Sequence, residues 1–389
     1  MIAHRYRTSA AALCAIPLLL AGCASSPGPA GAPAAAVDRL EPSCPAPTTR
    51  PVVSADLLNR MVARADLPMW QAGDIGASAR LSDGRLVWVF GDTVRVPRAT
   101  VRIVANSVLI SSGTCISQVL PDGDGPVIPD VDERTVRWPM SVVVLPPPAD
   151  LAAQGVDDVV VVLCARTRRG AGGPLDFQFR GTSAAVLTVS GGGAPQLQRI
   201  LEITPDDGAA DQIDWGAAAT GSGDRFYVYG TRLTGEPGTF GRELYVAAVP
   251  VTRPDDRAQW RFWDGDRWQA DIAAAAPVLP ARGGVSQTLS VDEVDGTWVA
   301  VSKRDGDVSD FVYTWTAPAP TGPWTPQRAL ASPAGYDTGE LTYAPLAHPE
   351  IPLESGNLLV SISRNTTDLA RLLADPEVGR PLFAEVPRP

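Results

Sequence analysis

The stretch GDIGASARLSDGRLVWVFGDT (residues 73–93) carries an aspartate near each end, Asp74 and Asp92. The triplet Ser82-Asp83-Gly84 at its middle is typical of a turn, and the run LVWVF that follows favours a strand. A hairpin folded about residues 83 and 84 places Asp92 roughly opposite Ile75, with Asp74 as its diagonal neighbour. Two carboxyl groups this close would titrate together, as the acid pair of a glycosidase does. The alternative is that both are solvent-exposed turn or strand-end residues, the usual place for carboxylates.

An apolar strand that ends in polar residues recurs five times along the chain. The five segments are LVWVFGDT (86–93), VVVVLCAR (159–166), RFYVYGTR (225–232), TWVAVSKR (297–304) and NLLVSISRN (357–365). Each has a partner segment upstream across a turn and a third strand downstream, so the repeating unit is a three- or four-stranded antiparallel sheet. Five such units in a row predict an all-β fold, a five-bladed β-propeller of antiparallel blades around a central channel.

The fifth unit lacks a segment for its outer strand, because the chain ends at Pro389 just after the third strand. Residues ahead of Asp74 are the unassigned supply, and an N-terminal strand there would close the ring and remove an exposed edge. The segment SADLLNRMVARADL (54–67) keeps another possibility open, since it reads equally well as a short helix capped by Ser54.

The first 22 residues have the features of a secretory signal, with Arg5 and Arg7 ahead of an apolar run too short to span a membrane. The run ends in LAGC (20–23), which resembles the bacterial lipobox, so we expect Cys23 to be lipidated. An ordinary cleaved signal that ends near a cysteine is the alternative. Residues 23–52 are rich in Pro, Ala, Gly and Ser and predict a flexible tether. This leaves 53–389 as the propeller domain, exported and held at the outer face of the plasma membrane in the cell envelope.

The composition bounds the partners. The chain holds 43 Asp and Glu residues against 33 Lys and Arg, without a basic stripe, which argues against nucleic acid as a target. Beyond Cys23, the cysteines Cys44, Cys115 and Cys164 allow at most one disulfide, for which Cys115–Cys164 is one candidate. None has a CxxC or Cys/His spacing, so we expect neither a zinc site nor another metal or cofactor. We expect a monomer.

Side chains where inner strands begin and second strands end should surround one mouth of the propeller channel. Besides Asp74 and Asp92, the candidates for substrate binding or for tuning the pKa of the pair are Asp214, Trp215, Gln287, Lys303, His348, Glu350, Arg364 and Asn365. Lys303 is the single lysine of the chain and is either the charge partner of a carboxylate or an exposed residue without a role.

Three of these candidates have clear structural alternatives. His348, the lone histidine after signal cleavage, is either a site residue or a hydrogen-bonded residue of the core or rim. Glu350 either faces the channel or simply ends a strand. Trp215 offers a flat face to a sugar beside Asp214, or it packs between blades.

Seven segments, in order, resemble the actinobacterial family catalogued as domain of unknown function 4185. They are GDIGASARLSDGRLVWVFGDT, RWPMS (137–141), DWGAAATG (214–221), YVYGTR (227–232), GGVSQTLSV (283–291), TAPAPTGPW (316–324) and AHPEIP (347–352). Members of that family are endo-D-arabinanases with a five-bladed propeller fold, and they cut D-arabinofuranosyl chains of mycobacterial-type arabinogalactan and lipoarabinomannan. The resemblance, which covers essentially residues 66–387, implies that Asp74 and Asp92 are the catalytic pair.

Two functions therefore stay open. The first is a cell-surface glycoside hydrolase that cleaves D-arabinofuranosyl linkages in cell-wall arabinan, with one aspartate as general acid and the other as nucleophile or base. The second is a non-catalytic, lipid-anchored propeller that binds envelope glycan or a protein partner. The paired aspartates favour the hydrolase, since a binding module needs no coupled carboxylates. Linkage preference, endo or exo action and the anomeric outcome are left open.

Overall fold

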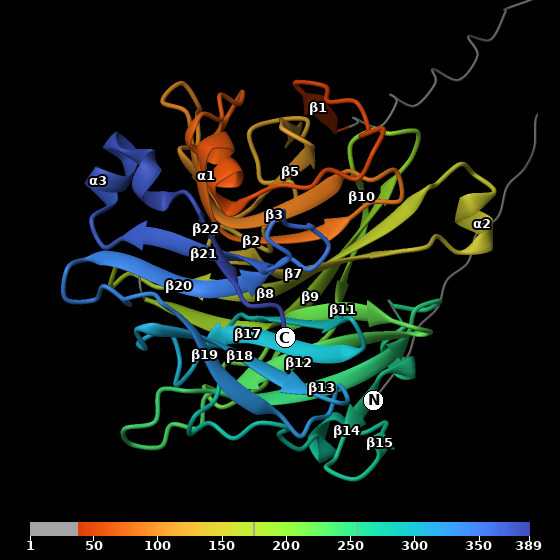
Figure 1. The fold of residues 1–389 in the computed structure, drawn as a ribbon, viewed down its shortest axis with the longest axis vertical. Helices are drawn as coiled ribbons and strands as arrows, with labels where there is room; N and C mark the ends of the chain where they lie inside the picture. The colour runs from red at the N-terminus through yellow and green to blue at the C-terminus, as the bar shows by residue number, and fades with distance from the viewer. Residues whose placement is uncertain (1–37, 174–175, 255) are drawn as a thin grey trace, which may run out of the picture. The chain divides into compact units, whose positions relative to one another are not determined.

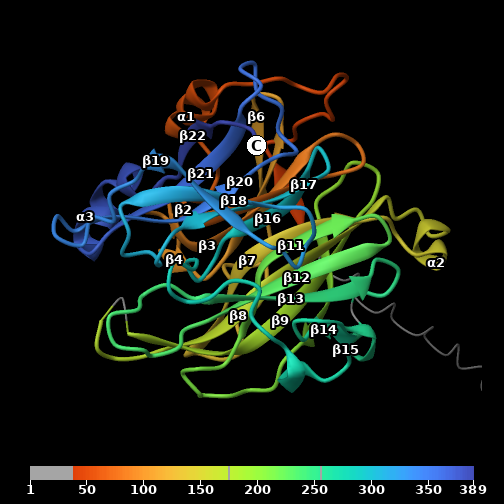
Figure 2. The same ribbon diagram turned by 60° about the horizontal axis from the view of Figure 1, so that its bottom comes forward.

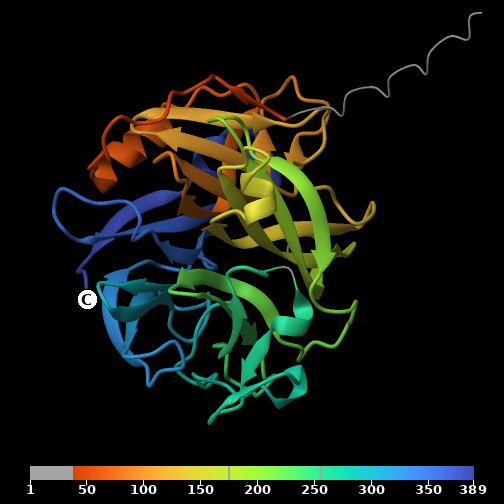
Figure 3. The same ribbon diagram turned by 90° about the vertical axis from the view of Figure 1, so that its right-hand side faces the viewer.

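A computed structural model describes residues 38–389 apart from 174, 175 and 255. The predicted signal peptide (1–22), Cys23 and the first part of the predicted tether lie outside the described residues. The described part is almost entirely β-structure and forms five antiparallel blades in a ring, which confirms the predicted five-bladed β-propeller (Figure 1). Figure 3 shows the chain running round the ring from orange through green and cyan to dark blue. None of the described helices is both long and apolar enough to cross a membrane.

In every blade the strand nearest the channel begins the unit. Blade 1 contains β2 (Trp70–Arg80), β3 (Leu86–Arg95), β5 (Ser107–Ser112) and β6 (Cys115–Leu120), with β4 (Ile103–Val104) paired to β3. Blade 2 contains β7 (Thr135–Leu145), β8 (Asp158–Arg169), β9 (Phe177–Val189) and β10 (Gln196–Glu202). Blade 3 contains β11 (Asp214–Ser222), β12 (Arg225–Arg232), β13 (Glu243–Pro250), β14 (Arg261–Trp263) and β15 (Trp268–Gln269). Blade 4 contains β16 (Ser290–Val294), β17 (Thr297–Lys303), β18 (Phe311–Ala317) and β19 (Thr325–Ala331). Blade 5 contains β20 (Glu340–Ala347), β21 (Leu358–Thr366) and β22 (Leu382–Val386). Short helical segments in the loops are α2 (Ala149–Ala152), η1 (Arg257–Gln259), η2 (Ile272–Ala274), α3 (Leu369–Ala374) and η3 (Pro376–Gly379).

The hydrophobic core lies between the blades. In β3, Val87 and Val89 pack into a cluster shared with blade 2, whereas Trp88 and Phe90 pack into one shared with blade 5. Successive side chains of a strand point to opposite faces, so a strand covered on both faces reads as a continuous apolar run. This explains why LVWVF lacks the polar alternation of a half-exposed strand.

The outer edge of blade 5 is covered by a helix. Helix α1 (Ala55–Ala63) begins at Ser54, whose hydroxyl accepts a hydrogen bond from the backbone of Leu57, and it lies beside β22 (Figures 1 and 2). The side chain of Asn59 donates to the carbonyl of Phe383 (2.9 Å) and accepts from its N–H (2.8 Å). One amide side chain thus supplies hydrogen bonds that an outer strand would have made. The predicted closing strand is wrong, and the helix alternative holds.

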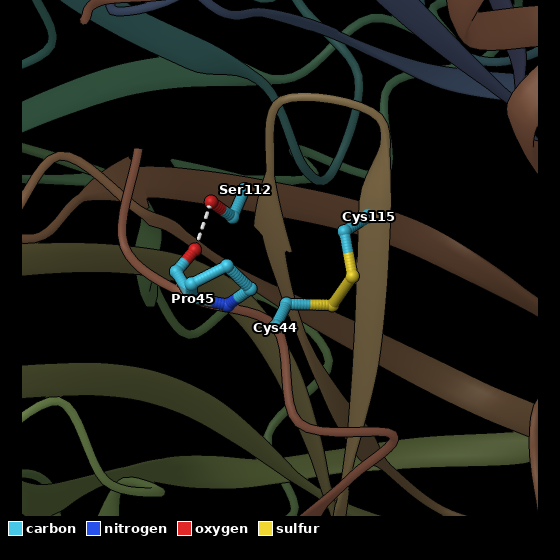
Figure 4. Close-up of a disulfide and its surroundings, with 4 residues drawn as sticks. All are labelled: Cys44, Pro45, Ser112 and Cys115. Atoms are coloured by element: carbon cyan, nitrogen blue, oxygen red, sulfur yellow. Dashed lines mark hydrogen bonds between the residues drawn. A yellow bond between two sulfur atoms is a disulfide. The ribbon is translucent and has the colours of Figure 1, made fainter. Parts of the chain in front are cut away.

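The segment ahead of the helix is attached to blade 1. Strand β1 (Arg39–Glu41) pairs with β6 at the outer edge of that blade, and Cys44 forms a disulfide with Cys115. Figure 4 shows the disulfide, with the carbonyl of Pro45 accepting a hydrogen bond from Ser112 next to it. The candidate pairing Cys115–Cys164 is therefore wrong, since Cys164 is a free thiol buried in β8. The described end of the predicted tether, from residue 38, is likewise tied down.

Candidate functional site

A β-bulge in blade 1 brings Asp74 and Asp92 together. Gly73 pairs with Thr93 and Ile75 with Phe90, so Asp74 faces the two residues Gly91 and Asp92 on β3. The prediction that Asp92 lies opposite Ile75 is therefore wrong. In the observed register Asp92 lies across from Asp74, which places the two aspartates closer than predicted. Ile75 has a φ of 65°, which is unusual for a β-branched residue, and its N–H donates to Ser363 of blade 5. Bulges of this kind turn a side chain out of the sheet and are common beside active sites.

Similar β-bulges occur in the inner strands of other blades around the channel. Registers also shift in β7 after Pro139, in β11 after Trp215 and in β20 after Tyr343. Together with loops, several of these irregular segments enclose a cavity of about 240 Å³. Its lining comprises Asp74, Ile75, Gly91, Asp92, Trp138, Pro139, Met140, Ala165, Phe177, Gln287, Thr288, Asp307, Tyr336, Leu341, Tyr343, Ala344 and Asn365. A larger groove beside α1, of about 370 Å³, has only one acidic lining residue and no paired carboxylates.

Asp74 is held in a state suited to carrying a proton. Its pKa is raised to about 7, first because burial disfavours the charged form and second because Asp92 carries a like charge nearby. The hydroxyl of Tyr343 donates to Oδ2 of Asp74 (2.7 Å) and acts in the opposite direction. Oδ1 is buried and has no hydrogen-bond partner among the described residues. A carboxyl group with a pKa near 7 can donate or accept a proton at neutral pH.

Asp92 is surrounded by donors. The indole N–H of Trp138 donates to Oδ1 of Asp92 (2.8 Å), and the guanidinium of Arg169 contacts the same oxygen at 2.5 Å. Burial raises the pKa of Asp92, while the charge of Arg169 and both hydrogen bonds oppose that rise. The side chain still faces the open cavity over about a third of its surface, 35 %. Arg169 and Trp138 thus favour the charged form of Asp92, against the larger effect of burial.

Aromatic side chains form part of the cavity wall. Phe177 stands edge-on to Trp138 with ring centroids 5.2 Å apart, and Arg169 lies over the same indole at 5.7 Å. Tyr336, from the loop ahead of β20, also lines the cavity and is exposed, as is Phe177. Flat apolar faces beside polar groups suit the C–H faces and hydroxyls of sugar rings.

Two of the predicted candidates, Gln287 and Asn365, line this cavity with the aspartates. The amide of Asn365 donates to the hydroxyl of Tyr343 at 3.3 Å, so it helps to orient the group that holds Asp74. The amide of Gln287 donates to Asp214 at 3.0 Å. Asp214 itself is buried behind the lining and paired with Arg242 at 2.7 Å. Its pKa is raised by burial, against the charge of Arg242.

Three candidates, Trp215, Lys303 and Arg364, have structural roles. Trp215 is almost fully buried against Tyr245 and Phe262, so its expected role as a sugar platform is wrong and the packing alternative holds. Lys303 is buried, and its ammonium donates to the carbonyl of Thr342 at 2.7 Å.

Arg364 donates to backbone carbonyls of Arg380 (2.7 Å) and Glu377 (3.1 Å) on the side of η3. The cation that contacts the pair is Arg169, which takes the place that Lys303, Arg364 or another cation was expected to fill.

His348 and Glu350 lie farther down the channel, after the end of β20. His348 is fully buried, with Ser78 2.6 Å from Nδ1 and Ser361 2.7 Å from Nε2, which matches the hydrogen-bonded core alternative. Glu350 accepts a hydrogen bond from Ser78 and lines two cavities of about 40 and 350 Å³ below the site. Neither residue lines the cavity of the aspartate pair.

The important partners that were missed are Trp138, Arg169 and Tyr343. Trp138 and Tyr343 lie in segments recognised as inner strands, but a tryptophan or tyrosine there reads equally well as core. Arg169 lies three residues beyond Arg166, the position taken as the end of the second strand; Arg166 instead pairs with Glu202. Strand β8 runs on to Arg169, and no local signal marks that extension. In the described part of the chain, no three His, Cys, Asp or Glu side chains cluster as a metal site would require.

Comparisons with known proteins agree with this architecture. Residues 57–387 match the family described as a domain of unknown function (DUF5005), so the expected membership of family 4185 is not confirmed. Among curated proteins, Notoamide biosynthesis cluster protein J′ of Aspergillus versicolor is 27% identical over 153 residues, which cover 38% of this chain and 40% of that protein. The chain thus matches less than half of that relative's length.

Solved structures share the fold. A protein of Bacteroides ovatus, described only as a proposed hydrolase, superposes with a TM-score of 0.64 at 16% identity, over 90% of this chain and 93% of that one. A glycoside hydrolase family 43 arabinoxylan arabinofuranohydrolase of Bacillus subtilis, solved with cellotetraose, gives a TM-score of 0.50 at 13% identity, over 81% of this chain and 63% of that one. At these identities the likeness concerns the fold.

Proposed function

The chain belongs to the family described as a domain of unknown function (DUF5005), and from the geometry of its channel cavity we propose that it is a glycoside hydrolase that uses Asp74 and Asp92. The observation that carries the proposal is the coupled pair itself: one carboxyl group with a pKa of about 7 beside a second one held by Trp138 and Arg169. Glycosidic bonds are cleaved by carboxyl groups of unequal protonation, one of which must hold a proton at working pH.

The proposed chemistry follows from the partners of each aspartate. Asp74 gives its proton to the glycosidic oxygen as the sugar leaves. Asp92 remains charged, raises the affinity of Asp74 for its proton and stabilises the positive charge that develops on the sugar ring. Tyr343 holds Asp74 in place through its hydroxyl.

We propose D-arabinofuranosyl chains of arabinogalactan and lipoarabinomannan as the substrate. The support is the resemblance of the seven segments to endo-D-arabinanases, together with a cavity whose walls combine aromatic rings and amides. The cavity of about 240 Å³ is large enough for one sugar unit of a longer chain. The protein would act as a monomer.

We also propose that the chain is exported and anchored by lipid at Cys23, so that the propeller meets arabinan outside the plasma membrane. The Cys23→Ala variant should then be released from membranes or accumulate as an uncleaved precursor. A variant that stays membrane-bound with a normally processed N-terminus would show that the signal is of the ordinary secreted kind.

The decisive experiment is digestion of purified arabinogalactan with the wild type and with Asp74→Asn and Asp92→Asn, followed by oligosaccharide profiling. We expect the wild type to release arabino-oligosaccharides and each variant to be slower by about 100-fold or more, the scale for loss of a positioned acid or base. Thermal melts establish that the variants are folded. A matched control is Asp266→Asn, which changes an exposed aspartate in the turn between β14 and β15.

Two results would contradict the proposal. Cleavage near the wild-type rate by either folded variant removes that aspartate from the mechanism. Binding of arabinan by the wild type without any cleavage, unaffected by Asp74→Asn, would instead identify a non-catalytic glycan-binding propeller.

A further inference from the structure

Hydrolysis of a glycosidic bond needs carboxyl groups on two sides of the sugar, about 5–9.5 Å apart. Asp74 and Asp92 both project from one bulge on adjacent strands of blade 1, so a carboxylate on another blade is better placed to reach the opposite side of the sugar. The carboxyl group of Asp74 lies against Gly91, the residue before Asp92, because a Cβ atom added to Gly91 would lie 2.4 Å from Oδ1 of Asp74. The pair therefore reaches the cavity from a single wall.

A third carboxylate lines the same cavity. Asp307 lies in the loop between β17 and β18 of blade 4, and it is the one remaining acid among the described lining residues. Blade 4 is separated from blade 1 by blade 5 on one side of the ring and by blades 2 and 3 on the other. Asp307 thus enters the cavity from a different wall than the pair.

The surroundings of Asp307 fix its position. Its Oδ1 accepts a hydrogen bond from the backbone N–H of Ala344 at 3.2 Å, in the bulge of β20 that also presents Tyr343. Lys303 lies beneath the loop, and the charges of Asp307 and Asp310 act on its ammonium.

We propose that Asp307 is the general base of the hydrolysis, acting from the side of the sugar opposite to Asp74. The assignment rests on the proposed function. A water bound by Asp307 attacks the anomeric carbon and passes one proton to its carboxylate. At the same time the bond from that carbon to the glycosidic oxygen breaks, and this oxygen takes the proton of Asp74. One water is consumed, and the two carboxyl groups regain their starting states by exchange with solvent. A single displacement of this kind inverts the anomeric configuration.

The test uses 4-nitrophenyl D- and L-arabinofuranosides of both anomers together with arabinogalactan. Asp307→Asn keeps the acceptor for Ala344 and should lower kcat by about 100-fold or more on every substrate that the wild type cleaves. Asp74→Asn should retain far more activity on the nitrophenyl substrates, because 4-nitrophenolate leaves without a proton. Azide should restore Asp307→Ala and yield a glycosyl azide, since an anion that attacks directly needs no base, and it should not restore Asp74→Ala.

Asp310→Asn is the matched control, because Asp310 shares the loop and the influence on Lys303 but does not line the cavity. It should stay within about twofold of the wild type, as expected for an exposed surface change. NMR of the first product should show inversion.

The outcomes separate the two claims. A folded Asp307→Asn variant with near wild-type kcat, or a product of retained configuration, would overturn the assignment of the base while leaving the hydrolase intact. A wild type that cleaves none of these substrates would overturn both.

Discussion

Replacing Tyr343 by phenylalanine should raise the pKa of Asp74, whereas replacing Asp92 by asparagine should lower it. The Tyr343 hydroxyl donates to Asp74 at 2.7 Å and favours its charged form. A hydrogen bond to a charged group contributes about 1.5–3 kcal/mol, and 1.36 kcal/mol corresponds to one pKa unit. Tyr343→Phe should therefore move the pKa of Asp74 from about 7 upward by about 1–2 units.

Asp92→Asn acts with the opposite sign. The variant removes a like charge that raises the pKa of Asp74, and it leaves Arg169 free to favour the charged form. Because burial is the larger cause and remains, the pKa should fall by about 1–2 units without reaching its ordinary value.

Carbon-13 NMR of aspartate-labelled protein measures these shifts without any assumption about activity. Asp74→Asn identifies the resonance, and Tyr343→Phe and Asp92→Asn are titrated beside the wild type. Tyr313→Phe, in blade 4 and outside the cavity lining, is the control. If Asp74 is the acid, the fall of kcat/KM at high pH should move with the same pKa. Equal shifts in one direction for both variants, or no shift in Tyr343→Phe, would refute the assigned electrostatics.

Three further outcomes follow from particular contacts. Gly91→Ala should lower kcat by about tenfold or more with little loss of stability, because the new methyl group would lie 2.4 Å from Oδ1 of Asp74 and push that carboxyl group out of place. Gly221→Ala is the control: its methyl group would have no contact closer than 3.8 Å, so kinetics should not change, and equal kinetics for the two variants would contradict the prediction. Asp74→Asn should raise the melting temperature at pH 8 more than at pH 5, since a pKa raised from 3.8 to about 7 costs the folded state stability as pH rises through that interval; a larger gain at pH 5 would reverse the sign of the argument. Reduction of the disulfide between Cys44 and Cys115, which closes a loop across 71 positions, should lower stability by up to about 4 kcal/mol, measured by denaturant unfolding with and without reductant; a Cys44→Ser variant that still responds to reductant would contradict it.

The fold was readable from the sequence because its signals are local and repeated. Each second strand, such as 86–93 or 225–232, is an apolar run bounded by turn residues, and five of them in order leave little choice of architecture. The features that the sequence did not predict depend on contacts between segments that are far apart in the chain. A Pro-rich stretch that includes Cys44 has the composition of a linker, and only its disulfide to Cys115 ties it to blade 1.

The site was predictable to the extent that its residues lie at strand ends. Asp74 and Asp92 belong to one hairpin, so their proximity follows from a short-range turn. The partners that set their charges come from other blades: Trp138 and Arg169 from blade 2 and Tyr343 from blade 5. A register shift of one residue decides which of these side chains reaches the channel, and bulges leave no clear mark in a single sequence.

The conformation and environment of Asp74 and Ile75 lower the stability of the fold, and this loss supports a catalytic role for Asp74. Asp74 is half-buried, its buried Oδ1 has no partner among the described residues, and it lies beside a second acidic side chain and next to Ile75 at a φ of 65°. Burial of an unpaired polar atom, proximity of like charges and a left-handed β-branched residue each lower the stability of the fold. An asparagine or serine at either position would meet a purely structural need at lower cost. Because the three unfavourable features meet at a single point of the channel wall, a role that requires a proton on Asp74 at neutral pH explains them together.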